Sequence, residues 1–305
     1  MEKHRKKLIK NAAVFDGHSS GLAHGKKIVI EDDLVTEITG DEVSEENFGE
    51  VFDGTGMVAM PGMTDAHVHM GCLFAKGEFP VDYATVLTVA KCKDALMAGF
   101  TTFRDAGSVS EGLKLAFDEG VLPGPRIYPC GAYISQTCGH GDSEYAHTYR
   151  DIQYRHPSST VLADGVPEII RAVREQFYRG ASHIKLMATE ILNRHEDIRL
   201  LFGTDMMITG PDYQVEQSED IRYYEKRFGT MRALRALTGT ANEVFALTTY
   251  QNPYPKGKIG VLEAGSYADL LLVDGDPTKS VSVLADTDHL RLIMKGGTVY
   301  KNTLC

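Results

Sequence analysis

The chain has 305 residues, 43% of them hydrophobic, which is enough for one large α/β domain with a small satellite and a substantial core. Its formal net charge of −10 argues against a nucleic-acid or anionic-membrane surface, because such surfaces need clustered Lys and Arg. No run of about 18 apolar residues and no apolar segment behind the charged N-terminus is present. We therefore expect a cytoplasmic protein, which five cysteines without a Cys-x-x-Cys pair also fit.

Both ends of the chain predict short β-strands. β-favouring runs alternate with Gly, Asp and Asn turn signals, which places strands at 8–15, 27–31, 34–39 and 51–53, and again at 258–274, 290–295 and 298–301. Neither end makes a sheet that is stable alone. We therefore expect residues 1–59 and 256–305 to pair into one small β-sandwich domain.

The middle of the chain, residues 60–255, alternates between strand and helix patterns. Strands are predicted at 101–104, 126–134, 184–187 and 200–205, and helices at 83–98, 111–119, 166–179, 231–237 and 240–247, with a polar loop after residue 205. Such alternation indicates a parallel sheet with crossover helices.

The stretch 60–70 contains a short apolar run that starts after Pro61-Gly62 and ends in His67 and His69. Residues two apart on a β-strand point to the same face, so both imidazoles would meet at one place. This is the geometry of a pair of metal ligands. A lone His-x-His also arises by chance in strands, so the pair needs support from the rest of the chain.

Later stretches place polar residues at the ends of predicted strands or in loops that follow them. Arg104 and Asp105 end one strand, His140 lies between two glycines in a polar loop, Lys185 sits inside an apolar strand, and Asp205 ends another strand. Five polar residues therefore fall at predicted strand ends, namely His67, His69, Asp105, Lys185 and Asp205, which is more than ordinary surface positions would supply.

Together with the two histidines, these stretches resemble the amidohydrolase superfamily of metal-dependent hydrolases. The similarity is greatest to the imidazolonepropionase-like branch that includes Xaa-Pro dipeptidases and related carboxypeptidases, and it runs from about residue 8 to residue 302. The resemblance implies an α/β fold, a (β/α)8 TIM-type barrel over 60–255 wrapped by the terminal β-sandwich. It implies hydrolysis of a C–N bond in a small amide, cyclic amide or dipeptide-like substrate by metal-activated water. A homo-oligomer remains open.

The resemblance also assigns roles to residues. His67, His69 and Asp205 would hold one divalent metal, zinc first, and Lys185, carboxylated by carbon dioxide, would bridge it to a second ion. Asp205 would act as base and then as acid, taking a proton from water and passing it to the leaving amine. His140 would contact the substrate.

Other readings of these residues stay open at this point. Arg104 and Asp105 either orient the metal ligands or form an internal ion pair. Lys185 could equally be a salt-bridged lysine, and Asp205 a helix N-cap. His183 and His195 are spare ligand candidates, and the first shares a strand face with the lysine.

One part of the family pattern is absent. The family supplies two more histidines from its fifth and sixth barrel strands, but only 205 − 185 − 1 = 19 residues lie between Lys185 and Asp205. Three β-α units need about 30 residues each. We therefore expect an incomplete barrel, internally shortened near 188–200, in which the metal ligands spread apart.

The alternative to an active hydrolase is a catalytically impaired relic or a truncated gene product. On that reading, a longer form with about 90 to 100 more residues between Ala188 and His195 would be the competent enzyme, since three units of about 30 residues are absent.

Overall fold

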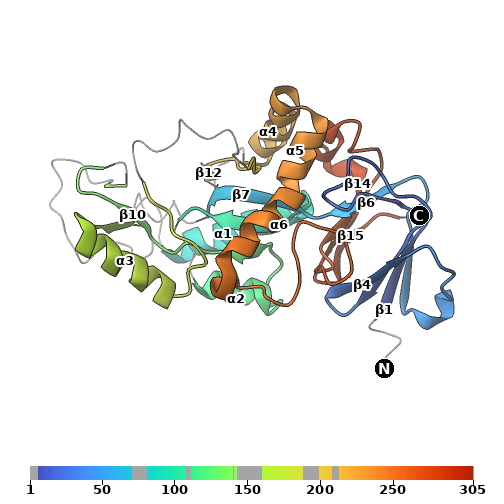
Figure 1. Ribbon diagram of the computed structural model, residues 1–305, viewed down its shortest axis with the longest axis horizontal. Coiled ribbons are helices and arrows are strands. Elements are labelled where there is room, and N and C mark those ends of the chain that lie inside the picture. Colours follow the sequence, from blue (N-terminus) through green and yellow to red (C-terminus); the bar gives the residue numbers. More distant parts are fainter. Residues whose placement is uncertain are drawn as a thin grey trace.

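The computed structural model describes residues 6–70, 81–107, 111–139, 141–142, 160–187, 199–207 and 213–304. The strands from both ends of the chain gather at one end of the molecule, and the strand-helix segment occupies the other (Figure 1). In the described part of the chain, no helix combines the length and the hydropathy needed to cross a bilayer.

Two sheets form the terminal end. One has the order β4-β3-β1-β5, with bounds Leu34–Thr39, Lys27–Glu31, Lys6–Lys10 and Glu50–Asp53. The other has the order β15-β14-β13-β6-β2, with bounds Thr298–Asn302, Leu290–Lys295, Leu270–Val273, Val58–Pro61 and Ala13–Val14. The C-terminal strand β13 pairs antiparallel with β6, and β2 pairs parallel with β6, so the two ends of the chain share a sheet.

One apolar core lies between these two sheets. Ile9, Ile28 and Ile30 come from the first sheet, and Leu270 and Leu272 from the second, and all five are buried in one cluster. Close packing of two strand layers removes apolar surface from water, which stabilises each layer only in the presence of the other. The division of the chain into a sandwich domain and a barrel domain stays a prediction.

A parallel sheet occupies the other end. Its order is β12-β7-β8-β9, with bounds Met206–Met207, Met63–His69, Phe100–Asp105 and Arg126–Tyr128. A separate parallel pair joins β10 (Tyr133–Ser135) to β11 (Thr160–Leu162). Within the described residues these strands do not close into a ring, so the fold is the incomplete α/β barrel that the sequence predicts.

Helices cover the strands and connect them. They are α1 (Val81–Met97), α2 (Glu111–Asp118), α3 (Val166–Tyr178), α4 (Tyr213–Phe228), α5 (Thr230–Leu237) and α6 (Gly239–Phe245). Short 3-10 turns lie at η2 (Glu45–Asn47), η4 (Ala246–Gln251), η5 (Val281–Ala285) and η6 (Thr287–His289). The α5 helix buries half of its residues, namely Ala233, Leu234, Ala236 and Leu237.

Several local predictions are wrong. Residues 200–205, expected as a strand, form none, and β12 begins only at Met206. The strand expected over 258–274 is confined to Leu270–Val273. The single strand expected over 126–134 is split into β9 and β10, and Gly131 lies between them with a φ of 68° that a side chain would strain. The strand expected over 184–187 is reduced to one bridge, between Ile134 and Leu186. The polar loop expected after Asp205 contains α4, whose composition is polar but which buries Ile221 and Gln217.

Candidate metal centre

The two histidines of β7 present their rings on the same side of the strand. The ring centroids of His67 and His69 are 5.4 Å apart. The Nε2 atom of His67 lies 3.0 Å from Oδ1 of Asp205, and the Nε2 atom of His69 lies 3.2 Å from the same oxygen. One ligand atom from each of the three residues falls within 4.8 Å of the others, so the period-of-two argument leads to a real cluster.

Backbone contacts to β7 hold Asp205 in place. Its N–H donates to the carbonyl of His67 at 2.7 Å, and the N–H of Ala66 donates to the carbonyl of Phe202 at 2.8 Å. Gly203 allows this approach, because a Cβ there would lie 2.7 Å from Cβ of His67. Asp205 therefore sits just before β12 rather than at the end of the predicted strand, with a left-handed φ of 54°.

The conformation and exposure of Asp205 are unusual for a structural residue. A non-glycine residue at positive φ carries backbone strain of about 1–3 kcal/mol, and such strain concentrates at functional sites. The side chain is 72% exposed, so its carboxylate meets solvent on one side and the histidines on the other.

A fourth polar residue reaches the same place. The Nζ of Lys185 lies 2.9 Å from Nε2 of His67. Burial lowers the pKa of Lys185. Burial first and the nearby lysine charge second lower the pKa of His67 to about 4, so its imidazole is neutral at pH 7 and a nitrogen lone pair is available.

These distances contradict the expectation that an incomplete barrel spreads the ligands apart. His67 lies on β7, and Asp205 directly precedes β12. These two strands are neighbours in the sheet, since β12 pairs with β7 at Met206–Val68 and Met207–His69. Adjacent strands fix each other through their own hydrogen bonds, so a closed ring is not needed to hold this part of the cluster.

Asp65, to which the sequence analysis gave no role, lies beneath the cluster. It is fully buried and accepts hydrogen bonds from the N–H of His67 at 3.2 Å, from Oγ1 of Thr204 at 2.9 Å and from Nε2 of Gln217 at 3.3 Å. Burial raises the pKa of Asp65 to about 6. One carboxylate thus links β7, the segment that carries Asp205, and α4. The signal was available, because Asp65 shares the strand face of the two histidines by the same period of two.

Arg104 and Asp105 contact backbone around the cluster and not each other. Nη1 of Arg104 donates to the carbonyl of Ala66 at 3.4 Å, next to His67, and burial lowers the pKa of Arg104. Asp105 accepts from the N–H of Met70 at 3.2 Å and from the N–H of Gly107 at 3.1 Å. Both therefore contact backbone at the ends of the histidine segment, and their role in orienting the ligands stays a prediction.

His183 does not belong to the cluster. Its Nε2 lies 3.1 Å from the carbonyl of Asp105, and because a carbonyl only accepts, Nε2 carries the proton. Its Nδ1 lies 3.0 Å from Oγ of Ser182, and burial lowers its pKa to about 3. His140 and His195 lie outside the described residues.

The donor set fits a divalent ion such as Zn²⁺. Two imidazole nitrogens and a carboxylate oxygen are the ligand types of zinc sites with an open position, and a divalent charge would relieve the crowding of lone pairs and charge at these atoms. Lys185 would fit as a further ligand once its nitrogen carries a carboxylate, because an ammonium offers no lone pair.

The chain is similar in sequence to known hydrolases over part of its length. The model of the amidohydrolase family matches residues 58–198. Ochratoxinase of Aspergillus niger is 34% identical over 152 residues, which cover 43% of this chain and 31% of that protein. The 5-methylthioadenosine/S-adenosylhomocysteine deaminase of Dictyoglomus turgidum is 31% identical over 70 residues, which cover 23% of this chain and 16% of that protein. The matched stretch is thus about a third or less of these curated relatives.

Solved structures match over the whole fold. A crystal structure of an amidohydrolase superposes with a TM-score of 0.84 at 23% identity, over 98% of this chain and 100% of that one. A prolidase complexed with N-methylphosphonate-L-proline gives 0.83 at 21% identity, over 97% and 100%. The A. niger ochratoxinase gives 0.78 at 19% identity, over 98% and 96%. At these identities the likeness establishes the fold.

Proposed function

We propose that this chain, which belongs to the amidohydrolase family through residues 58–198, is a hydrolase that cleaves a C–N bond of a small amide, cyclic amide or dipeptide-like substrate. The observation that supports this function most is the meeting of His67, His69, Asp205 and Lys185 at one point, since it unites ligands from three separate stretches. Ochratoxinase and prolidase among the relatives favour the same bond type.

Three residues would hold a divalent metal in this proposal. His67 and His69 offer Nε2 atoms, and Asp205 offers Oδ1. When bound, the ion would supply Lewis-acid polarisation of the substrate carbonyl and a lower pKa for water. Zinc is the first choice because it prefers this mixed nitrogen and oxygen set. Carboxylation of Lys185 would add an anionic oxygen between this position and that of a second ion.

Asp205 would move the proton. Its exposed carboxylate would take a proton from the attacking water at Oδ2 and later deliver it to the nitrogen of the leaving amine, so one residue serves as base and then as acid. Arg104 and Asp65 would keep the histidine segment and the aspartate segment in register during both transfers. His140 remains the proposed substrate contact.

A second candidate is a chain that keeps the fold and binds metal but turns over poorly. The open sheet and the 19-residue interval between Lys185 and Asp205 favour it, since the family's two remaining histidines have no place in that interval. Loss of a second ion would remove the clamp on the scissile carbonyl.

Hydrolysis assays separate the two candidates. The purified chain is loaded with Zn²⁺ and offered N-acyl amino acids and Xaa-Pro dipeptides, with a chelator-treated sample and a His67→Ala, His69→Ala double variant alongside. If the zinc-loaded chain releases an amino acid from the substrate, and neither the chelator-treated sample nor the double variant does so, the result supports the hydrolase. Stoichiometric zinc binding without turnover supports the impaired chain, and a longer form of the protein should then restore activity.

A further inference from the structure

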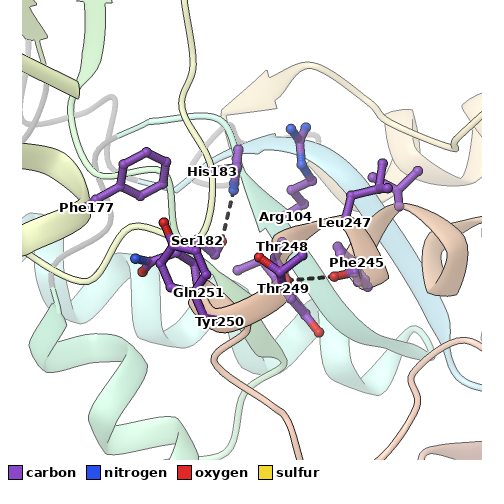
Figure 2. Close-up of a pocket in the computed structure, with 12 residues that line it drawn as sticks. Arg104, Phe177, Ser182, His183, Phe245, Leu247, Thr248, Thr249, Tyr250 and Gln251 are labelled. Carbon is purple, nitrogen blue, oxygen red and sulfur yellow. Dashed lines mark hydrogen bonds between the residues drawn. The ribbon is translucent and has the colours of Figure 1, made fainter. Parts of the chain in front are cut away.

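A cavity of about 370 Å³ lies beside the candidate metal centre, between α3 and the segment made by α6 and η4 (Figure 2). Phe177 enters it from α3, Ser182 and His183 from the strand-like segment that leads to Lys185, and Phe245 from the end of α6 (Figure 2). Its volume is within the range of ordinary small-molecule sites, which are mostly apolar with a few placed polar groups.

The charge of this cavity is one-sided. Among the described residues that line it there is no Asp or Glu, and Arg104 is the one residue that carries a charge at pH 7. Its single hydrogen bond within the described part of the chain is the 3.4 Å contact to the carbonyl of Ala66. A largely buried arginine, whose guanidinium has five N–H donors, therefore lines an apolar space in which no described lining residue is an anionic partner.

The walls are firmly built. The ring of Tyr128 stacks on Phe245 with centroids 3.8 Å apart and planes 3° from parallel, and its hydroxyl donates to Oδ1 of Asn252 at 3.2 Å. Oγ of Ser182 donates to the carbonyl of Pro129 at 3.0 Å. A cavity with fixed walls loses little entropy when it accepts a ligand.

The rim carries apolar side chains in an uncommon backbone. Leu247 is 65% exposed and Tyr250 is 89% exposed. Between them Thr249 takes φ 48° and ψ −119°, which lies outside the regions that a β-branched residue normally adopts. Strain of this kind is held at ligand-contacting segments more often than elsewhere.

We infer that this cavity is a second binding site, separate from the metal centre, for a small carboxylate with an apolar or aromatic body. The body would lie between Phe177, Phe245 and Leu247, and the carboxylate would reach the guanidinium of Arg104. A charge-assisted hydrogen bond to a buried guanidinium is about twice as strong as a neutral one, so the charge of the ligand should dominate its recognition.

The test uses two probes that share a body and differ in charge, 3-phenylpropionate and 3-phenylpropanamide. Calorimetric titration of the metal-free full chain should show the carboxylate binding once per chain and on the order of tenfold more tightly than the amide. The His67→Ala, His69→Ala double variant should bind it equally well. This separates failure of the present inference from failure of the proposed metal site.

Two variants place the binding in the cavity. Arg104→Gln should bring the carboxylate down to the affinity of the amide, whereas Arg171→Gln, which removes the same charge from the exposed face of α3, should leave it unchanged. Leu247→Glu adds a carboxylate at the exposed rim without altering the core, and should weaken binding of 3-phenylpropionate on the order of tenfold or more. Equal affinity for the two probes, or full carboxylate binding in Arg104→Gln and Leu247→Glu, would overturn the inference.

Discussion

Thr204→Val tests whether the buried carboxylate of Asp65 positions the metal ligands. The change keeps the shape of the side chain and removes one donor, the hydroxyl that lies 2.9 Å from Oδ2 of Asp65. Thr204 immediately precedes Asp205, whose left-handed backbone is held in place by its neighbours.

The expected cost has two parts. Loss of a hydrogen bond to a charged group should lower the free energy of unfolding by about 1.5–3 kcal/mol. Because residues that orient metal ligands typically account for 10–100-fold in affinity, zinc should bind weaker by a factor in that range, about 1.4–2.8 kcal/mol. The affinity is measured by competition with a chromophoric chelator, and the stability by urea unfolding of the metal-free chain.

A matched control is available in the same molecule. Thr230 donates to Oε1 of Glu225, also at 2.9 Å, and joins α5 to α4 away from the cluster. Thr230→Val should lower stability by a similar amount and leave zinc affinity unchanged. If both variants lose the same zinc affinity, or if Thr204→Val binds zinc as the unaltered chain does, the positioning role of Asp65 is refuted.

Three further predictions concern stability. Deletion of residues 256–305 should lower the thermal midpoint sharply or leave the chain insoluble, because β13 supplies a strand beside β6; an unchanged midpoint and solubility would contradict this. Asp269→Ala should lower the free energy of unfolding in urea by about 3–5 kcal/mol, because it leaves buried Arg126, whose Nε lies 2.8 Å from Oδ2 of Asp269, without its partner. Glu263→Ala, which removes an exposed ion pair with Lys258, should lower it by under about 1 kcal/mol. Equal losses in the two variants would contradict this prediction. Burial lowers the pKa of Lys295 to about 8, so between pH 8 and 10.5 the unfolded chain binds more protons than the folded chain does. The free energy of unfolding should therefore rise across this window by about 3 kcal/mol relative to Lys295→Met. Parallel pH profiles of the two proteins would refute the lowered pKa of Lys295.

The part of the site that the sequence predicts best rests on local periodicity. His67 and His69 face one way because strand geometry requires it, and no tertiary information is needed. Lys185 and Asp205 come only from the resemblance, because a lysine in an apolar strand or an aspartate after one has many ordinary explanations. That they meet the histidines depends on pairing between distant strands, which the local sequence does not encode.

The failures have physical causes. The sequence of α4 predicts a loop because polar and charged residues occur on nearly all sides of the helix. The burial of Ile221 becomes visible only in three dimensions. The spread of the ligands was expected from the geometry of a closed barrel, yet Asp205 depends on the neighbouring β7 and not on the ring. The period of two places Asp65 on the face of the two histidines, but its linking role depends on its hydrogen-bond donors. Two of these, Thr204 and Gln217, lie 139 and 152 residues away in the chain, so the local sequence does not show them.

The central claim is that His67, His69 and Asp205 hold a divalent metal. Elemental analysis of the chain after zinc loading and gel filtration tests it directly, with the His67→Ala, His69→Ala double variant compared with His18→Ala, His24→Ala, which removes two exposed histidines from another part of the chain. We predict bound zinc in the unaltered chain and in the exposed-histidine variant, and its loss from the β7 variant. Equal zinc in both double variants would contradict the account.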